Sequence, residues 1–153
     1  MLSIHLLGSP KLVRDGAPLT LSRRKSRALV YYLAAHQGSV SREHLLGIFW
    51  PDLDRPSAQQ TLRTTLHGLR QVLGAALNAD DGALSLAPEV AVDSRAFEAG
   101  LATPHSQTPQ APPDAAALTA TLELYQGDFL EGFSLPDSAA FEDWAAAERE
   151  RLR

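Results

Sequence analysis

The chain has no cysteine. This absence excludes a disulfide framework and every thiolate metal site. The N-terminal segment lacks the basic region and the following apolar region of a secretory signal peptide. The longest apolar run, residues 28–35, is far shorter than the roughly 20 residues that a membrane span requires. We therefore expect a cytoplasmic protein with no membrane partner.

Catalytic and metal-binding motifs are also missing. The five histidines are scattered without H-E-x-x-H spacing, and no glycine-rich phosphate loop of the Walker or G-x-G-x-x-G type occurs. Glu43 and His44 are adjacent, so on a helix their side chains diverge by about 100° instead of converging on one ion. We expect no catalytic residue, no metal and no cofactor. The enzyme alternative would be tested by metal uptake of the purified protein.

The net charge of −4 conceals a division along the chain. Residues 1–74 carry ten basic groups and four acids, a net charge of +6, whereas residues 75–153 carry four basic groups and fourteen acids, a net charge of −10. Such asymmetry favours a polyanion-binding half joined to a half with another task. The alternative is chance clustering of charges on solvated faces.

The first two-thirds of the chain predict three short strands, three helices and a hairpin. The β-favouring runs are 3–7, 11–13 and 19–21, with an Asp15-Gly16 turn signal between the second and the third. Helices are predicted over 23–36 after a cap at Ser22, after a cap at Ser41 with an end before Pro51, and over 58–73 after a cap at Ser57. A hairpin of 83–86 and 90–92 around Ala87-Pro88-Glu89 would then form a wing.

The last third predicts helices around a proline-rich connector. A short helix capped by Asp93 or Ser94 would run through residue 102, and others would span 116–125 and 138 to the end of the chain. The final ERERLR has no helix stop signal, so we expect the chain to end within a helix, as a fragment of a longer protein. That helix would expose Phe141, Trp144 and Leu152 and promote self-association.

The third predicted helix has two faces of opposite character. At about 100° per residue, Leu62, Leu66, Leu69 and Leu73 form one apolar stripe. No carboxylate lies between residues 59 and 77. The opposite side carries side chains with hydrogen-bonding ends, Gln60, Thr64, His67 and Gln71, and the cationic Arg63 and Arg70 flank them. Such a face suits the major groove of DNA, where Arg recognises guanine and Gln recognises adenine by paired hydrogen bonds. The alternative is an amphipathic helix that happens to lack acids.

A basic cluster begins the first predicted helix. Basic side chains oppose the helix dipole at this end, so local helix stability does not explain them. A nearby phosphate would explain them, and a solvated basic turn is the alternative. The cluster consists of Arg23, Arg24, Lys25 and Arg27.

Residues 6–74, from LLGSPKLV to LRQVLG, resemble the N-terminal domain of the antibiotic regulatory protein (SARP) family, and LELYQGDFLEGFSLPDSAAFEDWAAAERERLR resembles the start of its bacterial transcriptional activator domain. The resemblance is strongest over 24–33, 45–73 and 125–133. It implies an α+β winged helix of the OmpR type over 1–94: a small N-terminal antiparallel sheet, three helices and a C-terminal hairpin wing. All-α tetratricopeptide-like helices over 95–153 would follow.

The resemblance also implies a function. The chain would be a sequence-specific DNA-binding transcriptional regulator, an activator, which binds promoter repeats through its third helix in the major groove. The partners would be double-stranded DNA, RNA polymerase at the loop of Asp52, Asp54 and Arg55, and a second copy through the helical half. The DNA-facing residues would be Arg23, Arg24, Lys25, Arg27, Gln60, Arg63, Thr64, His67, Arg70 and Gln71.

One feature departs from the family pattern. A wing at Ala87-Pro88-Glu89 would offer an acid to the minor groove, where the family offers a cation. The alternative function is a protein-interaction adaptor built on a winged helix and tetratricopeptide-like helices. It predicts a chain without salt-dependent affinity for DNA.

Overall fold

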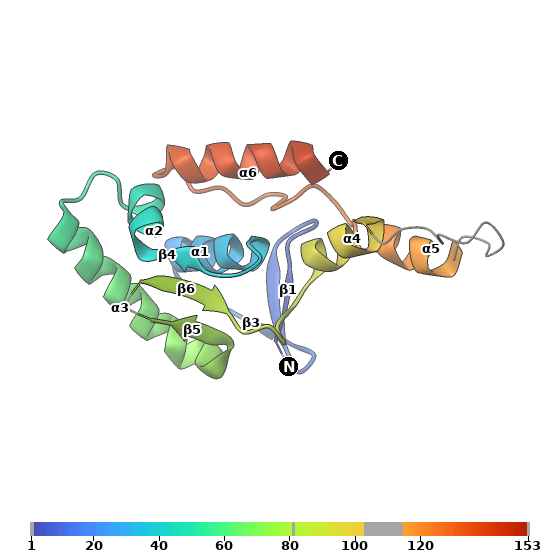
Figure 1. Ribbon diagram of the computed structural model, residues 1–153, viewed down its shortest axis with the longest axis horizontal. Helices are drawn as coiled ribbons and strands as arrows, with labels where there is room; N and C mark the ends of the chain where they lie inside the picture. Colours follow the sequence, from blue (N-terminus) through green and yellow to red (C-terminus); the bar gives the residue numbers. More distant parts are fainter. Residues whose placement is uncertain (1, 81, 103–114, 153) are drawn as a thin grey trace.

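The computed structural model describes residues 2–80, 82–102 and 115–152, and it is an α+β winged helix followed by helices (Figure 1). Strands β1 (Leu2–His5), β2 (Lys11–Arg14) and β3 (Ala17–Leu19) form an antiparallel meander. Between β2 and β3, Asp15 and Gly16 have φ angles of 51° and 81°, the conformation that a tight hairpin turn requires. The predicted N-terminal sheet is thereby confirmed.

Three helices and a hairpin complete the winged helix. Helix α1 spans Arg24–Ala35, α2 spans Arg42–Phe49 and α3 spans Arg55–Leu73. Strand β4 (Val40–Ser41) lies between α1 and α2, and the 3-10 turn η1 (Gly74–Ala76) follows α3. Strands β5 (Leu77–Ala79) and β6 (Ala83–Leu86) pair in an antiparallel hairpin, and with β4 they form a second sheet in the order β4-β6-β5.

The position of the wing differs from the prediction. The expected hairpin of 83–86 with 90–92 is wrong, because β6 pairs with β5, whereas β7 (Ala91–Val92) joins the first sheet in parallel with β1. A turn closed by the Val90 N–H and the Ala87 carbonyl, 3.0 Å apart, carries the chain from one sheet to the other. The sequence feature that predicts a hairpin at the observed wing is the Asp-Gly dipeptide at 81–82, which lies between Leu77 and Leu84.

Two predicted helix caps are wrong and one is confirmed. Arg23, not Ser22, occupies the cap position of α1 and makes no side-chain bond there. Helix α3 begins three residues early because Asp54 caps it, accepting from the Ser57 N–H at 3.2 Å and the Ser57 hydroxyl at 2.7 Å. Proline in the following first turn is compatible, since the amide it lacks would have no helical partner. Ser41 caps α2 as predicted.

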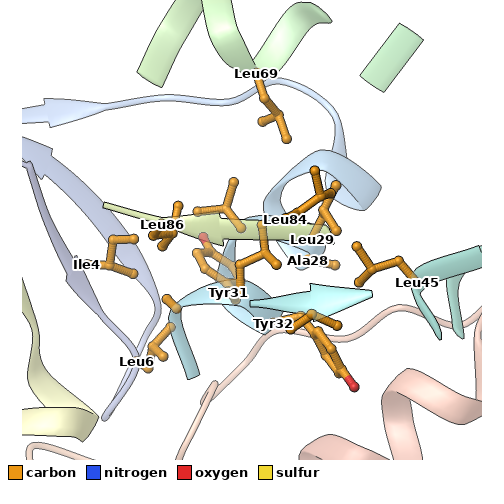
Figure 2. Close-up of a cluster of buried hydrophobic side chains, with 14 of the residues drawn as sticks. Ile4, Leu6, Ala28, Leu29, Tyr31, Tyr32, Leu45, Leu69, Leu84 and Leu86 are labelled. Carbon is orange, nitrogen blue, oxygen red and sulfur yellow. The ribbon is translucent and has the colours of Figure 1, made fainter. Parts of the chain in front are cut away.

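The core lies where the first sheet, the wing and the three helices meet. Figure 2 shows side chains from each of these parts converging: Ile4, Leu6, Ala28, Leu29, Tyr31, Tyr32, Leu45, Leu69, Leu84 and Leu86. All of them are buried. Burial of a leucine or isoleucine contributes about 1.5–3 kcal/mol. The apolar stripe of α3 is therefore held against the sheets, and its polar side is turned outward.

The C-terminal helices are α4 (Asp93–Ala102), α5 (Ala115–Glu123) and α6 (Ala139–Leu152). Helix α6 lies along α1 and α2, on the side away from α3 (Figure 1). Phe141 and Leu152 are buried, and Trp144 packs on Tyr32 with ring centroids 4.6 Å apart. The expectation that α6 exposes these three side chains is therefore wrong, because the helix folds back onto its own winged helix.

A backbone connection holds this arrangement together. The N–H of Leu130 donates to the carbonyl of Leu6 at 2.8 Å, and the N–H of Gly8 donates to the carbonyl of Asp128 at 3.0 Å. Ser138 caps α6 and donates to the carbonyl of Ile48 at 2.5 Å. Within the described ranges, no helix combines the length and the apolar character that crossing a bilayer requires.

Candidate nucleic-acid interface

Helix α3 has the two faces that its sequence predicts. Its four stripe leucines are at most 3% exposed. The six polar and cationic side chains of the opposite face are all exposed: Gln60, Arg63, Thr64, His67, Arg70 and Gln71. Because α6 lies on the other side of α1 and α2, the C-terminal helices do not cover this face (Figure 1). The surface is open to a partner as large as a duplex.

Arg63 and Arg70 are free cations. In the part of the chain that the structure describes, neither side chain has an ion-pair or hydrogen-bond partner. Several other arginines are engaged: Arg14 donates twice, at 2.8 Å, to carbonyls at the end of α3, and Arg95 donates to carbonyls at the end of α1. Arg55 pairs with a carboxylate of α2 at 2.5 Å. The outward face of α3 thus carries positive charge that the protein itself does not neutralise.

The basic cluster at the start of α1 divides between two surfaces. Arg23 and Arg24 are exposed and, among the described residues, their side chains have no partner. Lys25 lies 3.7 Å from the carboxylate of Asp137 and its ammonium sits 5.7 Å from the centre of the Trp50 ring. The guanidinium of Arg27 lies 5.8 Å from the centre of the Phe133 ring. Half of the cluster therefore contacts the protein itself, two of these contacts being made with its own C-terminal segment.

A groove of about 310 Å³ lies between Arg23, one of the two free cations of this cluster, and α3. One wall comes from the start of α1 and the segment before it, and the other comes from the outward and lateral faces of α3. The lining residues are Ser22, Arg23, Ser26, Thr64, Thr65, His67, Gly68 and Leu69. Hydroxyls, a free guanidinium and an imidazole here border one shallow depression, which suits an anionic group.

Hydrogen bonds within α3 order its outward side chains. The Thr64 hydroxyl donates to the carbonyl of Gln60 at 3.1 Å. The Gln71 amide nitrogen lies 3.2 Å from Nε2 of His67. Because an amide nitrogen only donates, Nε2 accepts this bond, and the ring proton then lies on Nδ1. His67 therefore keeps one donor for a partner.

The wing is acidic and contains no lysine or arginine from Leu77 to Leu86. The Asp80 carboxylate accepts from the N–H groups of Gly82 and Ala83, and these bonds hold the pKa of Asp80 below its ordinary value of 3.8. The Arg42 side chain donates to the Asp80 carbonyl at 2.7 Å and anchors the wing to α2. At neutral pH this wing tip is negative, so it offers no attraction to the minor groove.

The loop between α2 and α3 projects into solvent. Pro51 and Asp52 are exposed, and the apolar side chain of Leu53 is 43% exposed. Asp54 caps α3, and its hydrogen bonds from Ser57, the hydroxyl first, lower the pKa of its carboxyl. Of the three residues predicted to face polymerase, only Asp52 is thus free of a structural role, since Asp54 caps a helix and Arg55 is ion-paired.

Two histidines, His36 and His44, have structural surroundings. His44 Nε2 lies 2.7 Å from the Tyr32 hydroxyl, and His36 Nδ1 lies 2.6 Å from the Tyr32 carbonyl. His36 ends α1, as expected for it, and stacks on Trp144. Over residues 2–80, 82–102 and 115–152, no three His, Asp or Glu side chains gather in a cluster that could hold a metal ion.

Comparison with known proteins gives a likeness in fold to a solved structure. No family model matches the chain, and no curated protein matches it. Among solved structures, the chain is similar to Mycobacterium tuberculosis EmbR, determined in complex with a low-affinity phosphopeptide, with a TM-score of 0.69 and 21% sequence identity. The match covers 99% of this chain and 42% of EmbR. The two proteins therefore share this fold, and the chain spans about two-fifths of the length of EmbR.

Proposed function

We propose that this protein is a transcriptional regulator of the SARP type that binds double-stranded DNA by placing α3 in the major groove. The observation that carries the proposal is the outward face of α3, which is exposed, free of carboxylates and marked by the unpaired Arg63 and Arg70. A solvated helix without a partner has no need to exclude acids from such a face. The fold shared with EmbR agrees with the family resemblance of the sequence.

Different residues would have different tasks on the duplex. Gln60 lies on the side of α3 that faces away from the core, and Arg63 flanks it on the side of α2. Both would reach base edges. Arg23 and Arg24, at the start of α1, would contact phosphates, which fix position and carry no sequence information. Lys25 and Arg27 have no place in this proposed surface, because their side chains contact Asp137 and Phe133.

The loop before α3 supports a second contact. Its exposed Leu53, beside Pro51 and Asp52, is a surface that a protein would bind more readily than a nucleic acid would, and we assign it to RNA polymerase. The Leu53→Ala substitution is expected to reduce activated transcription from a target promoter and to leave the affinity for the promoter duplex unchanged. Unaltered activation would contradict this assignment.

The proposed function is tested by selecting duplexes from a random pool with the purified protein. We expect enrichment of a repeated half-site, bound about 10³-fold or more tightly than unrelated duplex at physiological salt. Recovery of a pool that remains random after several rounds would contradict the proposal. It would favour the adaptor alternative, in which the same winged helix binds another protein.

A further inference from the structure

Gly68 is placed where helix stability gives no reason for a glycine. It lies in the interior of α3, a helix of 19 residues, and its backbone is not in the left-handed region. Among the described residues, a Cβ built on Gly68 would meet no atom within 4 Å outside its own helix backbone and chain neighbours. Alanine would fit there and would stabilise the helix, since glycine is a poor helix former. The packing of the protein itself therefore does not require this glycine.

The surroundings of Gly68 point to a ligand. The residue is exposed and lines the groove between α1 and α3, together with Thr64 and His67. Ser22, Arg23 and Ser26 border the same groove from the side of α1. The free guanidinium of Arg23 and the Nδ1 donor of His67 are groups that bind a phosphate. The missing side chain leaves the helix backbone open to the groove that these donors line.

We infer that Gly68 is a DNA-contact residue: its lack of a side chain lets one phosphodiester of the bound duplex approach the α3 backbone in the groove lined by Arg23 and His67. This inference rests on the proposed function and deepens it, since it names the part of the duplex that occupies the groove. A methyl group at position 68 would occupy the space of the phosphate. The protein thus forgoes helix stability at this position in favour of binding.

The test compares Gly68→Ala with Gly47→Ala, a matched control. Gly47 is also helical and exposed, and a Cβ there would likewise meet no atom within 4 Å, but it lies on α2 and is not a lining residue of the groove. Each substitution is expected to raise the melting temperature by about 2–4 °C. Gly68→Ala is expected to weaken binding of the selected duplex about 10-fold or more, while Gly47→Ala binds as the wild type does.

A second measurement identifies the contact. Duplexes with single neutral methylphosphonates in place of phosphates are scanned against both proteins. One position is expected to weaken the wild type and to have little further effect on Gly68→Ala, because the substitution has already removed that contact. If the wild type binds the duplex and Gly68→Ala binds it equally well, the inference fails and the proposed function stands. If the wild type binds no duplex, both fail together.

Discussion

Some arginines of this protein donate hydrogen bonds to carbonyl groups at the ends of helices, and others do not. Arg14 and Arg95 donate to carbonyls at the C-terminal ends of α3 and α1, where the last carbonyls of a helix lack partners. Burial lowers the pKa of Arg95 from its ordinary range. Arg63 and Arg70 have no such task within the described residues, and we therefore assign them to a partner outside the chain.

Two arginine substitutions separate sequence readout from general attraction. Arg63→Ala is expected to lose about 1–3 kcal/mol of discrimination at one or two base positions, because a bidentate contact to guanine would be removed. Arg24→Ala is expected to weaken all duplexes about equally, because a phosphate contact is the same for every sequence. Competition binding with single-base variants of the selected site measures both effects. Wild-type behaviour of both variants would show that the face is wrongly assigned.

Properties of single residues could be predicted where they depend on near neighbours in the sequence, and could not where they depend on distant residues. The two faces of α3 follow from the spacing of its leucines, so they were predicted correctly. The contacts of Lys25 and Arg27 depend on Asp137 and Phe133, which lie far along the chain and are brought close only by the packing of α6. No local pattern carries that information. The DNA contacts of individual side chains stay a prediction.

At the scale of the secondary-structure elements, helix α3 begins with an N-cap, Asp54, whose carboxyl group titrates with pH. The hydroxyl and the N–H of Ser57 donate to Asp54 and hold the pKa of its carboxyl below 3.8. A group whose pKa is lowered by folding stabilises the protein above its unfolded pKa, and this contribution is lost as the pH falls through the folded pKa. The ionised cap therefore supports α3 at neutral pH and is weakened in acid.

Asp54→Asn tests this behaviour, because asparagine keeps an acceptor oxygen for the cap and does not titrate. The variant is expected to show a shallower fall of melting temperature between about pH 5 and pH 2 than the wild type does. Ser57→Ala, which removes the largest cause of the shift, is expected to change the acid dependence in the same direction. Melting curves followed by circular dichroism supply the measurement. Identical acid profiles for all three proteins would exclude a titrating cap.

The wing shows why an element was misplaced. Alternation in 83–86 and 90–92 predicted two strands correctly, but their partners were wrong, because strand identity does not determine pairing. Strand β5 pairs with β6, and its Leu77 is buried in the core. Strand β7 pairs instead with β1 at the edge of the first sheet. The hairpin of β5 and β6 is also acidic, so the wing still offers no cation to the minor groove.

At the scale of the whole molecule, the C-terminal segment and the winged helix share one core. Phe141 is fully buried and contacts Phe49 of α2, and Trp144 packs on Tyr32 of α1. Backbone bonds join Leu6 and Gly8 to residues 128–131. The sequence predicts a domain boundary near residue 94. The packing of α6 on α1 and α2 depends on contacts across this boundary, which no local sequence pattern encodes.

A shared core predicts a single cooperative unfolding transition. Urea titrations followed by far-UV circular dichroism and by tryptophan fluorescence are expected to coincide, since Trp50 and Trp144 report on the two parts of the chain. Phe141→Ala is expected to lower the free energy of unfolding by about 3–5 kcal/mol and to keep the transition single. Two separated transitions in the wild type would indicate independent domains.

The central claim is that the outward face of α3 and the exposed start of α1 form a cationic surface for duplex DNA. It is tested most directly by fluorescence anisotropy of a labelled duplex, titrated with the protein at several salt concentrations. If about four to six phosphates are neutralised, the logarithm of the association constant falls with the logarithm of the salt concentration with a slope of about −4 to −5. An association constant that does not change with salt would contradict the claim.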